Sequence, residues 1–289
     1  YGRVSGEKLM EVIKTEYKGM QDNMFLLKSQ YQGFDRSVNN NITLIKNEID
    51  NPLLLDTSDK FNFINQLDTN KYEIKSGNWL VDNPIIIEGD LHIHPGVNLK
   101  FSKDAYIIVK GSMTAIGDSS NLITLKSIQK SWKGIYVLNA NKKSYLKNII
   151  ISNLSGLEDG LLKLTGGITF YKSDVDFENV KINNTTAEDA INIIESSFTF
   201  NSVFIDNTLS DGLDLDFSKG SILHSKLSNI GGDALDFSGS KVTVQNTKAN
   251  NVKDKAISAG ERSDVDINNS YFNKIGVGIA SKDGSLVNI

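Results

Sequence analysis

Six aspartates recur in the second half of the chain at spacings that would bring their carboxylates together. Asp211 and Asp233 lie 22 residues apart, and so do Asp214 and Asp236. The whole aspartate cluster is Asp189, Asp211, Asp214, Asp216, Asp233 and Asp236. Carboxylates held about 5 Å apart repel each other, so that one takes up a proton with a raised pKa or a cation binds between them. A protonated acid beside an ionised base can cleave glycosidic bonds, and clustered carboxylates bind Ca²⁺.

We therefore expect the aspartate cluster to be the functional site. The candidate catalytic residues are Asp211, Asp214, Asp233 and Asp236, with Asp233 as the acid and Asp211 or Asp214 as the base. The candidate substrate-binding residues are Asp216, Lys255, Glu261 and Arg262. No cofactor is required, but a calcium ion would bind at Asp214, Asp216 and Asp236. The alternative is a structural role, because Asp-Gly before a strand is ordinary turn chemistry.

The residues between these aspartates predict where the carboxylates point. Leu213, Leu215 and Phe217 alternate with Asp214 and Asp216. A period of two is typical of a β-strand with one buried face. If the apolar residues point inward, the two aspartates point outward, and the same pattern returns 22 residues later.

A period of 22 residues organises the chain from residue 189 onward. One apolar column keeps it: Ile191, Leu213, Leu235, Ile257 and Ile279. An asparagine column keeps it too: Asn207, Asn229, Asn251 and Asn273. A second apolar column is expected at Ile205, Leu227, Ala249 and Tyr271. Such a period, with several short strands per repeat, predicts a β-solenoid whose coils stack at the strand spacing of roughly 4.8 Å. We expect the asparagines to form an internal ladder at a bend.

The asparagine column, the 22-residue register and the segments Asp211–Asp214 and Gly232–Asp236 resemble the pectate-lyase-like superfamily, over roughly residues 72 to 289. The resemblance implies an all-β, right-handed parallel β-helix with about 22 residues per coil. Many members are bacterial envelope or polysaccharide-acting proteins, which implies a glycan partner and an extracellular or cell-envelope location. The fold does not define an activity, because it hosts lyases, hydrolases, epimerases, binding modules and adhesins.

One branch of that superfamily offers a closer comparison. Ser210–Gly212 and Gly232–Asp233 partly match two elements of polygalacturonase-like hydrolases that lie one coil apart. However, Gly232 replaces the first residue of their Asp-Asp pair, Lys255–Ser258 stands where Gly-His-Gly is expected, and no Arg-Ile-Lys follows. The chain thus lacks residues that this hydrolase mechanism uses. A lyase would instead use Lys255 or Arg262 as the base, with calcium held by the aspartates.

The N-terminal part of the chain has a different pattern. Apolar residues from Met10 to Phe34 recur at intervals of three and four, which predicts an amphipathic helix. We expect two domains, a helical segment with a linker over 1–60 and the β-helix over 61–289. The helix either packs within the chain, on a neighbouring domain or the open end of the solenoid, or forms a homo-oligomeric coiled coil through residues 8–45. Met and aromatic residues on the stripe favour packing.

Composition excludes several classes of function. The net charge of −4 disfavours nucleic-acid binding. Without cysteine there is no disulfide and no thiol catalysis. No run of about 18 apolar residues is present, so no membrane span is expected. No signal peptide is visible, and Leu286–Ile289 begins a further coil, so we expect a fragment of a longer protein.

Two functions remain open. The first is a cell-surface or secreted module that binds or processes a polysaccharide, as a hydrolase, lyase or epimerase if it is an enzyme. The second is a non-catalytic structural scaffold, similar to an adhesin or a tailspike, that oligomerises through its N-terminal helix.

Overall fold

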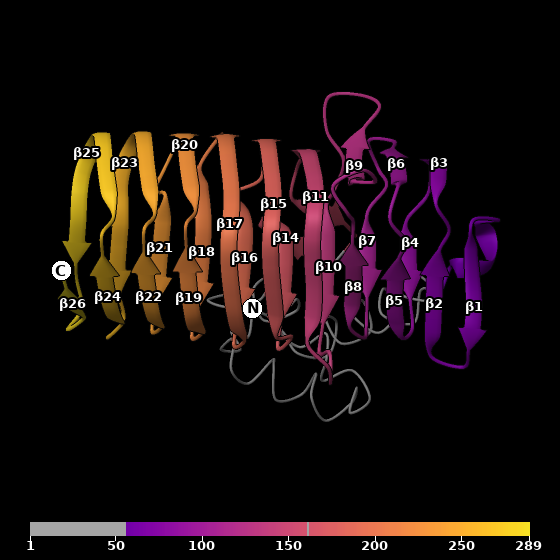
Figure 1. Cartoon of the computed structure of the whole chain (residues 1–289), viewed down its shortest axis with the longest axis horizontal. Coiled ribbons are helices and arrows are strands. Elements are labelled where there is room, and N and C mark those ends of the chain that lie inside the picture. Colours follow the sequence, from indigo (N-terminus) through magenta and orange to yellow (C-terminus); the bar gives the residue numbers. More distant parts are fainter. Residues whose placement is uncertain (1–55, 161) are drawn as a thin grey trace, which may run out of the picture. The chain divides into compact units, whose positions relative to one another are not determined.

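The computed structural model describes residues 56–160 and 162–289. These residues form an all-β parallel β-solenoid of about ten coils, as predicted. The coils follow one another along the solenoid from β1 to β26 (Figure 1). The expected helix over 8–34 and the oligomer contact over 8–45 lie outside the described residues.

Each coil contributes strands to three parallel sheets. The first sheet contains β4 (Ile85–Ile87), β7 (Ile107–Val109), β10 (Ile135–Leu138), β14 (Gly166–Tyr171), β16 (Asp189–Ile194), β18 (Asp211–Asp216) and β21 (Leu235–Ser238). The second contains β2 (Lys71–Ile74), β5 (Asp90–Ile93), β8 (Met113–Ile116), β19 (Lys219–Leu223), β22 (Lys241–Gln245), β24 (Asp264–Asn268) and β26 (Leu286–Asn288). The third contains β3 (Gly77–Val81), β6 (Val97–Phe101), β9 (Ile123–Ser127) and β20 (Lys226–Ile230).

Five long strands turn a corner and belong to two sheets. Those joining the second and third sheets are β11 (Ser144–Leu154), β15 (Val175–Thr185) and β17 (Ser197–Thr208). Those joining the third and first sheets are β23 (Lys248–Gly260) and β25 (Tyr271–Ser281). The remaining elements are the 3-10 turn η3 (Ser58–Lys60), β1 (Ile64–Asp68), which pairs antiparallel with β2, and the antiparallel hairpin of β12 (Leu157–Asp159) and β13 (Leu162–Leu164).

The predicted apolar column is confirmed and extends further than the sequence analysis traced it. Leu213 pairs with Leu235, and Leu235 pairs with Ile257. Ile191 continues the column before Leu213, and Ile279 continues it after Ile257. Earlier coils add Ile168, Ile135, Ile107 and Ile85. Because one coil cannot bury these side chains alone, their stacking forms the continuous core.

The second apolar column departs from the prediction at its end. Ala249 pairs with Phe272, whereas Tyr271 pairs with Lys248 and is 62% exposed. The last coil here has one residue more than 22, and a shift of one residue moves a side chain to the opposite face of a strand. Phe217 was also expected inside. It is instead 61% exposed, with a left-handed φ of 50° that turns it out of the strand.

The asparagine ladder exists, but it is external, and the prediction of an internal ladder was wrong. Asn207, Asn229 and Asn251 are exposed and have φ values of 60°, 55° and 57°. Asn251 Nδ2 donates to Asn229 Oδ1 over 2.7 Å. In the next coil Lys274, and not Asn273, has the left-handed φ, because of the same extra residue. Asn is selected here because it tolerates left-handed backbone at a corner.

Candidate functional site

The three outer aspartates, Asp214, Asp216 and Asp236, lie on the outer face of the first sheet. Their strands, β18 and β21, alternate because the core residues Leu213 and Leu215 face inward and are at most 1% exposed. Asp214 pairs in register with Asp236. All three carboxylates are partly exposed. The outward direction predicted from alternation is therefore confirmed.

The outer aspartates have no cationic partner in the described part of the chain. No lysine or arginine there forms an ion pair with any of them. Burial, followed by the charge of Asp216, raises the pKa of Asp214 far above its ordinary value. Burial also raises the pKa of Asp216, with contributions from the charges of Glu261 and Asp236. Asp214 therefore holds its proton more strongly than an ordinary aspartate does.

Asp214 and Asp236 belong to a longer column, which we call the polar row: Thr169, Asn192, Asp214, Asp236 and Ser258. Asn192 Nδ2 donates to Asp214 Oδ2 over 3.0 Å. Three other buried atoms of the row have no hydrogen-bond partner within the described part of the chain: Thr169 Oγ1, Asn192 Oδ1 and Ser258 Oγ. An unpaired buried polar group costs roughly 1–3 kcal/mol. The row therefore has unused donors and acceptors on both sides of its two carboxylates.

The corner aspartates, Asp189, Asp211 and Asp233, have a different environment. Asp211 Oδ1 accepts from the backbone N–H of Asp233 over 2.8 Å. Asp233 Oδ1 accepts in turn from the N–H of Lys255 over 2.9 Å and from its Nζ over 3.2 Å. These bonds connect successive coils, so they support a structural role for Asp211 and Asp233.

Asp189 begins the corner column and is 4% exposed. Burial, with smaller contributions from the charges of Asp211 and Glu188, raises the pKa of Asp189 to about 7. Thr165 Oγ1 donates to its Oδ2 over 3.3 Å. The carboxyl is therefore close to half-protonated at neutral pH.

The predicted substrate-binding residues do not all reach the outer aspartates. Lys255 Nζ contacts Asp254 Oδ2 over 2.6 Å as well as Asp233. Its ammonium group is therefore already paired with two carboxylates at the corner. Glu261 lies close enough for its charge to raise the pKa of Asp216. Arg262 is exposed, and its backbone N–H donates to the Asp283 carbonyl over 3.2 Å. Of the four expected residues, Asp216 and Glu261 are those that the structure brings together.

The metal prediction remains open. Among residues 56–160 and 162–289, no group of three or more His, Asp or Glu side chains is arranged to hold a metal ion. Calcium needs six to eight oxygen ligands, so the outer aspartates would have to be joined by carbonyls, water or ligand hydroxyls.

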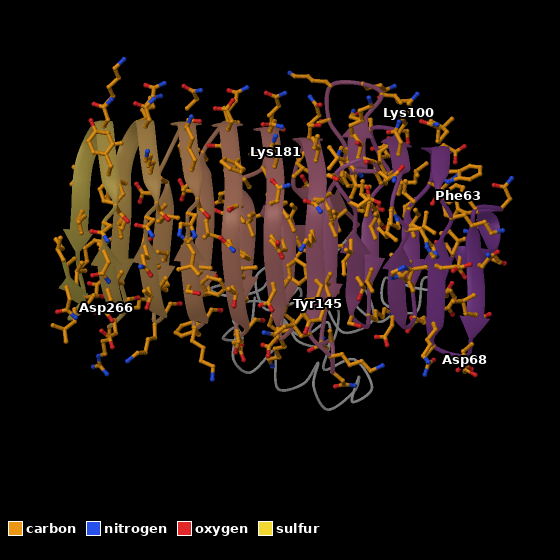
Figure 2. All side chains as sticks on the ribbon, viewed as in Figure 1. Phe63, Asp68, Lys100, Tyr145, Lys181 and Asp266 are labelled. Carbon is orange, nitrogen blue, oxygen red and sulfur yellow. The ribbon has the colours of Figure 1, made fainter. Side chains whose placement is uncertain are left out.

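Sequence reasoning missed a second feature, a hollow on the outer face of the third sheet. Its volume is about 650 Å³. The lining residues are Asn179, Lys181, Phe204, Ile205, Asp206, Lys226, Ser228, Asn229 and Asn250. Figure 2 shows the side chains on the ribbon, with Lys181 labelled. The signal was present in the sequence, because Phe204, Lys226 and Lys248 directly precede Ile205, Leu227 and Ala249 of the second apolar column.

No protein-family model matches the chain, and no curated protein matches it in sequence. In the part of the chain that the structure describes, no helix has the length and apolar character that crossing a membrane requires. The coarser assignment, a parallel β-solenoid, is what the strand pairing supports.

Proposed function

We propose that this chain is a polysaccharide-binding β-solenoid module of the cell envelope or of a secreted protein, and that sugar hydroxyls bind at the polar row. The supporting observation is the pair Asp214 and Asp236, which are partly exposed, stand in register on adjacent coils and have no cationic partner among the described residues. Such a row requires a ligand that both donates and accepts hydrogen bonds.

Saccharides meet this requirement. Each hydroxyl donates one hydrogen bond and accepts others, so it can donate to the partly exposed carboxylate of Asp236 and accept from a protonated Asp214 carboxyl group. Hydrogen bonds to an ionised carboxylate are roughly twice as strong as neutral ones. Successive coils are separated by roughly 4.8 Å, which is close to the length of one sugar unit in an extended chain. A glycan lying across β18 and β21 would therefore present successive sugars to Asp214 and Asp236.

Glycoside hydrolysis is a second candidate, which Asp214 and Asp236 favour. Carboxyls on adjacent coils lie near the roughly 5–5.5 Å separation of retaining glycosidases. The raised pKa of Asp214 suits a general acid, and Asp236 would be the nucleophile. This differs from the expected acid, Asp233, whose carboxylate accepts hydrogen bonds from both the backbone N–H and the ammonium group of Lys255. Asp233 as the acid remains a prediction, and the hydrogen-bond geometry favours Asp214.

A glycan array followed by calorimetry tests the proposal. The double variant Asp214→Asn, Asp236→Asn replaces both carboxyl groups by amides of nearly the same shape. Asp266→Asn is the matched control, because Asp266 is a partly exposed outward aspartate on the second sheet. We expect a glycan bound by wild type and by the control to lose at least about tenfold in affinity with the double variant.

Two outcomes would contradict the proposal. Wild-type protein could bind no glycan on the array, or the double variant could bind the identified glycan as tightly as wild type. For hydrolysis the readout is the release of reducing ends from that glycan. If wild type binds the glycan but releases no reducing ends, the polar row binds it without cleaving it.

A further inference from the structure

We propose that the hollow on the third sheet is a separate binding site for a carboxylated polysaccharide lying across the coils. The residues that carry this inference form one outward column, the basic–aromatic row: Lys181, Phe204, Lys226, Lys248 and Tyr271. The site goes beyond the polar row and does not depend on it, because it lies on another sheet and has the opposite charge.

The register places these side chains one above another. Lys181 pairs with Phe204, Phe204 with Lys226, and Lys226 with Lys248. Their chain neighbours in the second apolar column, such as Ile205 and Leu227, are buried, so the row itself faces outward. Adjacent members are separated by roughly 4.8 Å, the spacing of the strands.

The lysines of this row differ from other lysines on the solenoid. Lys147 is paired with Glu178 over 2.8 Å and Lys241 with Asp264 over 2.9 Å, and in both cases the acid stands in register on the next coil. Among the described residues, no such ion pair involves Lys181, Lys226 or Lys248.

Lys226 and Lys248 are stacked directly on each other, and like charges in that position are unfavourable. An anionic ligand would remove this repulsion. Two carboxylates on one polymer could pair with the two exposed ammonium groups.

The aromatic members give the row its preference for sugar. Phe204 is partly exposed within the hollow, and Tyr271 is 62% exposed beyond Lys248. Their ring faces can cover the apolar face of a sugar ring, while Asn250 lines the same hollow with a polar amide. The Asp206 carboxylate in the hollow accepts from Ser228 Oγ and Asn229 Nδ2, both over 2.8 Å, so these protein donors already occupy its Oδ1.

Single-stranded nucleic acid is the competing ligand, because it also binds basic surfaces with aromatic residues. Stacking of successive bases needs aromatic rings at short intervals. Phe204 and Tyr271 lie three coils apart, which is about 14 Å.

The test measures binding of alginate, a carboxylated polysaccharide, to the whole chain by biolayer interferometry at several salt concentrations. The variant is Lys226→Gln, Lys248→Gln. The matched control is Lys219→Gln, Lys241→Gln, because these lysines are exposed and also stacked in register, on the second sheet of the same two coils. A thermal melt of each protein checks that the fold is retained.

We expect wild type and control to bind alginate with an affinity that salt weakens, and the Lys226 and Lys248 variant to bind at least about tenfold more weakly. Neutral dextran should bind to none of them through this row. Phe204→Ala should also weaken alginate binding, which simple charge attraction would not cause. The variant Asp214→Asn, Asp236→Asn should bind alginate like wild type, so the two sites can fail independently.

Three results would overturn the inference. Wild type could fail to bind alginate, the control could lose as much affinity as the Lys226 and Lys248 variant, or poly(dT) could bind more tightly than alginate and depend on the same lysines. The last result would make the row a nucleic-acid site.

Discussion

The hydroxyl of Ser240 accepts a hydrogen bond from the backbone N–H of Ser218, one coil earlier, over 2.9 Å. It donates in turn to the Leu215 carbonyl over 2.9 Å. The same contact recurs along a buried serine ladder that connects Ser173, Ser196, Ser218, Ser240, Ser263 and Ser285. This ladder has the internal role that the sequence analysis gave to the asparagines.

Replacing Ser240 by Ala should therefore destabilise the solenoid. The change leaves the N–H of Ser218 without its partner in a buried corner, at a cost of roughly 1–3 kcal/mol. Urea denaturation followed by circular dichroism measures the free energy of unfolding. A loss below about 0.3 kcal/mol would show that water replaces the hydroxyl and that the ladder adds little.

The asparagine column should respond to substitution through its backbone. Asn229 is exposed with a φ of 55°, so Asn229→Ala should cost roughly 1 kcal/mol for left-handed strain. Asn229→Gly should cost less, because glycine adopts that φ freely, even though it also removes the bonds to Asp206 and Asn251. The same denaturation experiment compares the two. Equal losses would mean that the side-chain bonds dominate and that the φ argument is wrong.

The sequence predicted the solenoid because apolar residues such as Leu213 and Leu235 recur with its period. These side chains are buried only when successive coils stack. It misplaced Tyr271 because one inserted residue changes the register without changing the local pattern. It took the asparagines for internal groups because a period shows which residues stack, but not on which side of the backbone they lie.

The candidate site was predicted in part. Alternation placed Asp214 and Asp236 outside and in register. The partners of Asp233 could not be foreseen, since a carboxylate that binds the next coil's N–H looks the same in sequence as one that faces solvent. The serine ladder was visible as intervals of 22 and 23 residues, and the basic–aromatic row as a column beside Ile205 and Leu227.

Asp189 should make stability depend on pH. In the folded state its pKa is raised to about 7, against about 3.9 when unfolded. Between these values the folded state holds a proton that the unfolded state has lost, so the contribution of Asp189 to stability is most favourable at about pH 4 and below and falls as pH rises to about 7. Asp189→Asn should remove this decline and stabilise the protein at pH 7 by roughly 2–4 kcal/mol. The measurement is urea denaturation from pH 4 to 8, with the exposed Asp68→Asn as control. An unchanged pH slope in Asp189→Asn would rule out this carboxyl as its source.

Asp214→Asn and Asp233→Asn should change stability in opposite directions, although the chemical change is the same. The pKa of Asp214 is raised by burial and by neighbouring carboxylates, so its ionised form is disfavoured in the folded state. Its amide variant should be more stable than wild type at pH 7, and the gain should vanish near pH 3, where the carboxyl is protonated in both states.

Asp233 is 6% exposed and accepts from the N–H and the ammonium group of Lys255, so its amide variant loses charge-assisted bonds and should be less stable by roughly 2 kcal/mol at pH 7. Thermal melts of both variants at pH 3 and pH 7 give the comparison. A destabilised Asp214→Asn at pH 7 would mean that a bound cation or an ionised carboxylate at this position stabilises the folded chain, and the outer aspartates would then have to be reconsidered as a calcium site.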